Sequence, residues 1–162
     1  MVKNSLNDLL SRVDEMFPDE GYLCGETVLS LVAQARGIAS DFVPGLATGF
    51  CSGLGRTGGT CGALSGAVLA VSLLAGRNKP ESGDESRLEL GDCYARVQRV
   101  VRGFEEEFGS RDCTALCKCD LTTDQGREAF TETKAIAICR GLVRRAIELA
   151  LAATADLAES ES

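Results

Sequence analysis

The residues of this sequence that could do chemistry are its cysteines. Eight of the 162 residues are cysteine and none is histidine. The absence of histidine excludes a Ser-His-Asp triad, a Cys-His dyad, a zinc site with histidine ligands and a histidine-ligated haem. We therefore expect any catalytic or metal-binding chemistry of this chain to depend on thiols.

Cys61 has the position that most favours a thiolate. It stands at the predicted beginning of an apolar helix over residues 61–75, directly after a loop, residues 52–60, that contains four glycines. The positive end of a helix dipole and the free N–H groups there stabilise a thiolate relative to a thiol. We therefore predict that Cys61 has the lowest pKa of the eight cysteines. The same argument applies more weakly to Cys24, at the beginning of a predicted helix over residues 24–37.

The glycine-rich loop also matches the dinucleotide-binding pattern G-x-G-x-x-G, at residues 53–58. That fingerprint needs a strand before it and an acidic residue about 20 positions later. Here the preceding residues 42–50 contain one proline and two glycines, and the later region reads Arg77-Asn78-Lys79. We therefore reject a nucleotide site. A tight turn is one interpretation, and a functional loop is the other, in which backbone N–H groups and Arg56 stabilise an anion or a thiolate.

Three further cysteines form a dense cluster, Cys113, Cys117 and Cys119. Their spacing is neither the C-x-x-C of a thioredoxin-type site or zinc ribbon nor one of the ferredoxin spacings. One turn of helix would bring Cys113 and Cys117 together, because residues four apart lie on the same helix face. The cluster therefore indicates thiol chemistry without indicating which kind.

The last three cysteines lie within predicted helices or beside the loop. A helical stripe in the final helix is made of Ile136, Cys139, Val143 and Ile147. That spacing places Cys139 on the buried side of the helix. Cys51 and Cys93 have no spacing that requires chemistry, and we interpret them as packing residues.

The elements that must position these thiols are helices. Apolar residues recur with helical spacing along most of the chain, and no convincing alternating strand is present. The predicted helices cover residues 6–17, 24–37, 40–50, 61–75, 86–108, 122–132 and 134–157. Ser5 is the predicted N-cap of the first helix, and Ser86 with Glu89 has the pattern of a capping box. We predict an all-α domain of six or seven helices around the apolar helix at residues 61–75.

Length and composition fit one globular domain over residues 1–162, with a disordered tail at residues 158–162. A chain of this size can bury roughly 70% of its unfolded surface, so it needs no disulfide or metal merely to fold. Within the central helix, the small residues Gly62, Gly66 and Ala70 recur every four positions. That spacing predicts a face on which another helix comes close.

The net charge and the N-terminal residues limit the partners and the compartment that we expect for this protein. The chain has 17 Lys and Arg against 24 Asp and Glu, a net charge of −7, which argues against nucleic acid or an acidic membrane surface as partner. Its uncharged run at residues 61–76 is too short for a membrane span, and the first residues lack a signal-peptide pattern. We expect a cytoplasmic protein, in which reduced thiols indicate a metal, cluster or redox site more than structural disulfides.

The segment Thr60-Cys61-Gly62-Ala63-Leu64-Ser65-Gly66 carries a Cys-Gly-Ala-x-x-Gly motif. With it the chain resembles the C_GCAxxG_C_C family of redox-active proteins, whose members are small and carry four characteristic cysteines. The resemblance runs from about Gly21 to the last helix and includes the glycine segment from Gly49 to Arg56. It places the four characteristic cysteines at Cys24, Cys61, Cys113 and Cys139.

The resemblance implies a redox role and suggests an iron–sulfur cluster as cofactor. The implied catalytic residues and metal ligands are Cys24, Cys61, Cys113 and Cys139, with Cys119 as an additional candidate ligand. Residues expected to contact a cofactor are Arg56, Gly62 and Gly66. This chain departs from the four-cysteine pattern by its extra cysteines at positions 51, 93 and 117.

We predict that these four cysteines form one spatial group, as ligands of a cluster or metal ion or as a thiol–disulfide site. The alternatives are a non-catalytic zinc-binding domain and a structural helical interaction domain. The expected partner is a redox protein or a small thiol, and a homodimer is a further expectation. Whether the protein is an enzyme is left open.

Overall fold

The structure is a computed structural model that describes residues 5–158. In this part of the chain 71% of the residues are helical and no strand is present, which confirms the predicted all-α class. The helices are α1 (Leu6–Met16), α2 (Cys24–Ala35), α3 (Val43–Thr48), α4 (Cys51–Arg56), α5 (Gly62–Ala75), α6 (Asp84–Phe108), α7 (Cys113–Cys117), α8 (Asp124–Glu132), α9 (Ala135–Ala153) and a short 3-10 helix, η1 (Asp156–Ala158).

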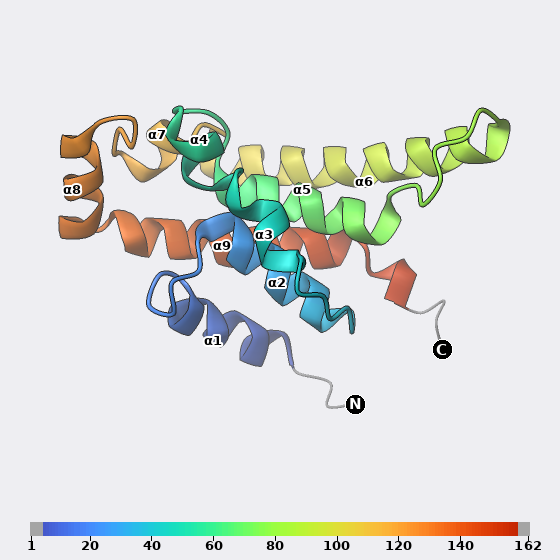
Figure 1. Cartoon of the computed structure of the whole chain (residues 1–162), viewed down its shortest axis with the longest axis horizontal. Helices are drawn as coiled ribbons and strands as arrows, with labels where there is room; N and C mark the ends of the chain where they lie inside the picture. Colours follow the sequence, from blue (N-terminus) through green and yellow to red (C-terminus); the bar gives the residue numbers. More distant parts are fainter. Residues whose placement is uncertain (1–4, 159–162) are drawn as a thin grey trace.

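Helix α5 is the centre of the bundle, as predicted. It packs against α2, α6 and α9, and α1 covers α2 and α9 from outside (Figure 1). The core is built from fully buried side chains of these helices, including Val28, Val32, Leu64, Val71, Phe104, Val143 and Ile147. The last two belong to the predicted stripe of the final helix, so its apolar spacing correctly identified the buried face.

Glycines let α2 and α5 approach closely. A Cβ atom on Gly66 would lie 2.6 Å from the carbonyl oxygen of Gly25, and one on Gly25 would lie 2.9 Å from that of Gly62. Side chains at these positions would force the helices apart. The predicted small-residue face of α5 is therefore confirmed, and it packs on the first turn of α2.

Helix boundaries follow the sequence closely where local side chains set them. Ser5 caps α1 as predicted, in a capping box in which Ser5 accepts from the N–H of Asp8 and Asp8 accepts from that of Ser5. The predicted box at Ser86 is wrong, because α6 begins at Asp84 with Gly83 as its N-cap. The helix count exceeds the predicted six or seven because α4 and α7 occupy segments interpreted as a loop and a turn.

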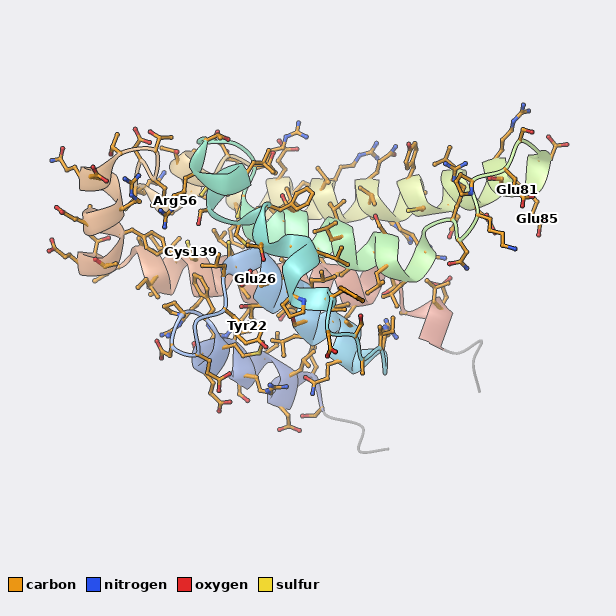
Figure 2. The ribbon with its side chains drawn as sticks, in the orientation of Figure 1. Tyr22, Glu26, Arg56, Glu81, Glu85 and Cys139 are labelled. Atoms are coloured by element: carbon orange, nitrogen blue, oxygen red, sulfur yellow. The ribbon has the colours of Figure 1, made fainter. Side chains whose placement is uncertain are left out.

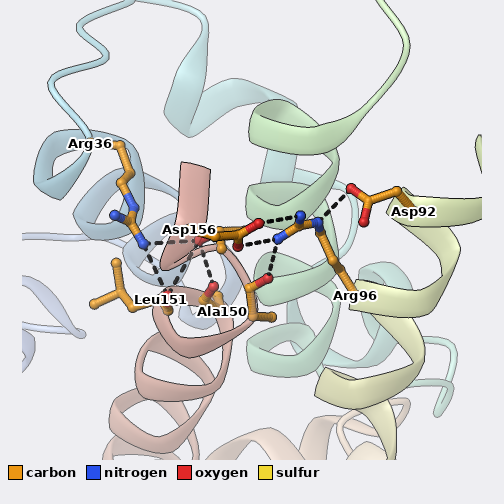
Figure 3. Close-up of polar contacts among 8 residues, drawn as sticks. Arg36, Asp92, Arg96, Ala150, Leu151 and Asp156 are labelled. Carbon is orange, nitrogen blue, oxygen red and sulfur yellow. Dashed lines mark hydrogen bonds and ion pairs between the residues drawn. The ribbon is translucent and has the colours of Figure 1, made fainter. Parts of the chain in front are cut away.

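A buried arginine holds the end of α9 to α6 (Figure 3). Arg96 donates two hydrogen bonds to Asp156, at 2.6 and 2.7 Å, one to Asp92 at 2.6 Å, and one to the carbonyl oxygen of Ala153 at 2.8 Å. Its side chain is only 6% exposed, whereas both carboxylates face solvent. The guanidinium thus connects the last turn of α9 to the middle of α6.

A second arginine explains why α9 ends at Ala153 and not near residue 157. Arg36 donates to the carbonyl oxygen of Leu151 and to the hydroxyl of Thr154, at 2.9 and 3.1 Å (Figure 3). With Arg96 on Ala153, these contacts satisfy carbonyl groups that a longer helix would have paired itself. Ala158, which was expected in the tail, ends η1, and the rest of that expected tail lies outside the described residues. No helix within residues 5–158 has the length and apolarity to span a membrane.

Candidate functional site

Two of the predicted site cysteines are held side by side by backbone hydrogen bonds. The N–H of Cys61 donates to the carbonyl oxygen of Arg111 at 2.7 Å, and the N–H of Cys113 donates to that of Gly59 at 3.0 Å. These bonds form an isolated antiparallel bridge between Thr60 and Asp112. Because Cys61 is the N-cap of α5 and Cys113 is the first residue of α7, the bridge aligns the beginnings of two helices.

The other two predicted cysteines reach the same place from α2 and α9. Cys24 is the first residue of α2, and Cys139 lies near the beginning of α9. Cys24 is close to α5, because a Cβ atom on Gly62 would lie 2.5 Å from its sulfur. Cys139 lies at the end of the molecule where α4, α7 and α8 gather, far from Glu81 and Glu85 (Figure 2).

All four cysteines line one cavity of about 260 Å³. Cys117, at the end of α7, also lines it. The rest of the wall is mostly apolar and includes Phe17, Pro18, Leu23, Leu121, Phe130 and Leu142. This volume corresponds to roughly nine water molecules, which is small for a nucleotide and suits a compact inorganic or small organic group.

The remaining predicted site residues divide between the cavity and its surroundings. Arg56 and Gly62 line the cavity, but Gly66 contacts Gly25 and Val28 instead, so its direct role is helix packing. Cys119 does not line the cavity, but it is buried in a small cluster with Cys113, Cys117, Leu121 and Ala135, three of which do.

Sequence reasoning missed two thiols of this group. Cys117 lines the cavity, and its spacing of four from Cys113 was the available signal. Cys51, interpreted as a packing residue, lies near Cys24, whose thiol raises the pKa of Cys51. No spacing in the sequence indicated that contact, because α4 and α2 are brought together only by the fold. Cys93 lies on α6 and does not line the cavity.

Burial raises the pKa of three of the cavity thiols, Cys61, Cys113 and Cys139. It raises the pKa of Cys61 from the ordinary 9.0, and the nearby backbone N–H groups of Leu64 and Ala63 offset this only in part. Burial, with the neighbouring thiol of Cys117, raises the pKa of Cys113 to about 12. The pKa of Cys139 is raised by burial and by the other sulfurs around it.

These shifts overturn the expectation that Cys61 has a depressed pKa. The predicted helix N-terminus is present, but loss of water around a buried thiol outweighs the helix dipole. A raised pKa makes these thiols weak nucleophiles near neutral pH. They become thiolates readily only if a positive group enters among them, since metal ions deprotonate the thiols that they bind.

The charges that surround the cavity are nevertheless positive. Among the described residues, the charged residues that line it are Arg56 and Arg127, and Arg127 is ion-paired with Asp124, whereas the whole chain carries a net charge of −7. Three long helices, α2, α5 and α9, begin at this end of the molecule (Figure 1). Their partial positive charges add to those of the arginines, so the cavity favours an occupant with net negative charge.

The segment before α5, for which a tight turn was one of the two interpretations, contains a strained left-handed turn. Within α4, Ser52, Gly53, Leu54 and Gly55 have φ angles of 56°, 70°, 47° and 63°, which form a left-handed turn. This conformation costs a non-glycine residue about 1–2 kcal/mol. Gly53 is also required sterically, because a Cβ atom there would lie 2.7 Å from that of Cys113. Strained backbone of this kind clusters at functional sites, and Ser52 and Arg56 both line the cavity.

The arrangement of sulfurs distinguishes between kinds of metal site. In residues 5–158, no three His, Cys, Asp or Glu side chains are close enough to share a single metal ion. A tetrahedral zinc ion would hold four sulfurs at about 2.3 Å, so the thiols as placed do not form such a site. An iron–sulfur cluster is larger and spreads its four thiolate ligands over several iron atoms.

The fold and the cavity define a helical protein with a buried group of cysteines at one end of its bundle. Residues 22–153 match the family described as "Putative redox-active protein (C_GCAxxG_C_C)", and the chain belongs to this family. It is also 28% identical over 140 residues to an uncharacterized protein of Archaeoglobus fulgidus, a match that covers 82% of this chain and 85% of that protein. No solved structure matches the chain significantly.

Proposed function

We propose that Cys24, Cys61, Cys113 and Cys139 form the redox centre of this protein and hold an iron–sulfur cluster. The observation that carries the proposal is that four separate elements bring these thiols to one small, apolar-walled cavity. Membership of a redox-active family supports the redox role. When bound, such a cluster supplies an acceptor and donor of single electrons.

The protein's own residues would stabilise the negative charge of such a centre. The net positive charge of an iron–sulfide core is smaller than the negative charge of its four thiolate ligands. The ligated centre is therefore an anion. Arg56, Arg127 and the beginnings of α2, α5 and α9 supply positive charge beside it. The apolar wall excludes water, and Gly62 and Gly53 leave room for the sulfurs of Cys24 and Cys113.

A thiol–disulfide site is the second candidate, and one contact favours it. Cys113 and Cys117 are separated by one turn of α7, and the thiol of Cys117 is near enough to help raise the pKa of Cys113. All eight cysteines are free thiols, so this function would require a pair to close by oxidation. Because its pKa is raised, little of the Cys113 thiol is ionised near neutral pH. Its attack on a disulfide is therefore slow, which makes this candidate the weaker one.

The setting of the protein is part of the same proposal. A centre made of reduced thiols suits the cytoplasm, and a redox protein or a small thiol would exchange electrons with it. Whether two copies of the chain associate is a separate expectation, tested by its mass in solution. A zinc-binding or purely structural domain is the alternative that the following experiment rejects or supports.

The test is purification without oxygen, followed by metal and sulfide analysis and a visible absorption spectrum. We expect a brown protein with iron and acid-labile sulfide, or one that becomes so when ferrous iron and sulfide are supplied under reducing conditions. Alanine at any of the four cysteines should remove most of the bound iron, whereas Cys93→Ala, a matched buried cysteine, should retain it. A colourless protein that binds zinc, or full iron retention in all four variants, would contradict the proposal.

A further inference from the structure

Cys51 is one of four buried thiols, within the described residues, that the proposed centre does not use. It is 1% exposed at the beginning of α4 and does not line the cavity. Its sulfur donates a hydrogen bond to the carbonyl oxygen of Ala47 at 3.3 Å, and it lies near Cys24, whose thiol helps to raise the pKa of Cys51. A free thiol beside a proposed ligand can react with that ligand, so this contact has chemical consequences.

The absence of side chains at two glycines, Gly62 and Gly25, lets these cysteines lie close to one another. The position of a Cβ atom on Gly62 would be 2.5 Å from the sulfur of Cys24 and 2.9 Å from the Cα atom of Cys51. The corresponding position on Gly25, the residue after Cys24, lies 3.1 Å from the sulfur of Cys51. Both cysteines therefore lie around the same point at the crossing of α2, α4 and α5. To form a disulfide, the two sulfurs must approach to about 2.05 Å.

The two thiols also differ in access. Cys24 is half-buried at the cavity, whereas Cys51 is enclosed. An external reagent therefore meets Cys24 first, and Cys51 is placed behind it. The thiol of Cys24 and burial raise the pKa of Cys51, but a mixed disulfide at Cys24 removes the first of these causes, so Cys51 can then displace the reagent. This is the usual arrangement of an accessible cysteine next to a resolving cysteine.

We propose that Cys24 and Cys51 close as a disulfide when the cofactor-free protein meets a low-molecular-weight disulfide, and that this bond blocks loading of the centre. Cys24 attacks one sulfur of the reagent, forms a mixed disulfide and releases one reagent thiol. Cys51 then attacks the sulfur of Cys24 and releases the second reagent thiol, which takes up the proton. The cysteine pair loses two electrons, and the reagent disulfide gains them.

The blocking part of this inference rests on the proposed function, because it matters only if Cys24 is a ligand. In the disulfide, the sulfur of Cys24 has no thiolate to offer a metal. Reduction of the bond would restore it. Loading of the centre would therefore depend on the thiol–disulfide balance around the newly made chain.

The linkage can be tested by peptide mapping, because trypsin separates the cysteines concerned. Cleavage after Arg12, Arg36 and Arg56 gives residues 13–36 with Cys24, residues 37–56 with Cys51 and residues 57–77 with Cys61. Cofactor-free protein would be treated with oxidised glutathione, its free thiols blocked with N-ethylmaleimide, and the digest measured by mass spectrometry without reductant. We expect peptides 13–36 and 37–56 to appear linked, and the link to be lost in Cys51→Ala but kept in Cys93→Ala.

Reconstitution with iron and sulfide then tests the block. Oxidised wild-type protein should fail to bind iron until dithiothreitol is added, whereas oxidised Cys51→Ala should bind it to a clearly greater extent without reduction. A link from Cys24 to Cys61, or blocked thiol at both Cys24 and Cys51, would overturn the disulfide proposal. Equal sensitivity of wild type and Cys51→Ala to oxidation would overturn the block. If the reduced forms of both proteins bind no iron, the proposed cluster fails, while the peptide map still judges the disulfide.

Discussion

The two ends of α9 differ in how far the buried polar groups beside them are satisfied by hydrogen bonds. At its C-terminal end, Arg96 is buried but makes four hydrogen bonds to Asp92, Asp156 and the carbonyl oxygen of Ala153. Near its N-terminal end, Cys139 faces a cavity lined by other thiols, none of which is joined in a disulfide. The first region is satisfied by the protein itself. The second leaves several thiols without strong partners.

This difference indicates which region serves stability and which serves chemistry. Arg96, on α6, donates to a carbonyl oxygen at the end of α9 that the helix itself leaves unpaired. Its role is therefore explained by the folded chain alone. A group of sulfur atoms around a cavity adds little to stability, because thiols are weak hydrogen-bond donors and the space between them is not filled. The cysteine end therefore has a structure that an additional group would complete. The predictions below separate the two regions, beginning with the largest expected effect on stability.

Loss of Arg96 should be the most destabilising change. Arg96→Ala removes four hydrogen bonds and leaves the carbonyl oxygen of Ala153 unpaired, so we expect the free energy of unfolding to fall by about 2–3 kcal/mol. Urea denaturation measures this directly. Arg99→Ala, an exposed arginine on the same helix, is the control and should change stability by less than about 0.5 kcal/mol. Equal effects of the two variants would show that the buried contacts are not the source of stability.

Two glycines in the strained turn offer a matched pair at the cysteine end. Gly53→Ala and Gly55→Ala both place a side chain at a positive φ, 70° and 63°, but only the first meets Cys113, with a Cβ separation of 2.7 Å. We expect Gly53→Ala to be more destabilising than Gly55→Ala by about 1–2 kcal/mol, because steric overlap adds to the shared strain. Differential scanning calorimetry of both variants tests this. Similar melting temperatures would mean that Cys113 can move away freely.

Alanine at Cys139 should separate stability from chemistry. Removing one sulfur from the wall of an existing cavity should cost about 1 kcal/mol of stability in the cofactor-free protein. Cys93→Ala should cost a similar amount, because Cys93 is also buried. Iron content after reconstitution should fall strongly in the first variant only. A stability loss at Cys139 as large as that at Arg96 would assign this cysteine to the structural core instead.

The two regions should also respond to opposite extremes of pH. Arg96 lowers the pKa of Asp156 from 3.8 to about 2, so the stability from this pair is present above pH 3.8 and is lost as the pH falls through about 2. The urea midpoint of wild-type protein should therefore approach that of Asp156→Asn at low pH. If their separation stays constant down to pH 2, the ion pair is not responsible for it.

Alkaline conditions should act on the thiols. Burial raises the pKa of Cys113 from 9.0 to about 12, so the stability linked to its neutral form is present below pH 9 and is lost as the pH rises towards 12. Cofactor-free wild-type protein should weaken more steeply over this range than Cys113→Ala. Urea midpoints of both proteins between pH 8 and pH 11 measure the effect. Parallel curves would show that Cys113 ionises in the folded protein as easily as in the unfolded one.

Much of the fold could be predicted because its signals are local. The spacing of Val143 and Ile147 identified the buried face of α9, and Ser5 caps α1 as its side chain suggested. The motif around Cys61 led to the family that the comparison confirms. The pattern at Ser86 misled, since Gly83 and Asp84 were able to begin α6 two residues earlier.

The candidate site was less predictable because its properties depend on distant residues. A helix N-terminus at Cys61 was visible in the sequence, but the burial that raises its pKa comes from the surrounding helices. Cys51 has no informative neighbour in sequence, and only the crossing at Gly25 and Gly62 places it against Cys24. Which thiols are ligands of one centre stays a prediction.

The sequence by itself determined the helical class, the central place of α5 and the importance of cysteine, since apolar period, small-residue spacing and residue type are all properties of short segments. The tertiary structure alone decided which sulfurs share a cavity and how strongly each thiol holds its proton. Both depend on contacts between segments far apart in the chain, such as the bridge that aligns Cys61 with Cys113. Removal of water by those segments, more than any local feature, sets the chemistry of the thiols.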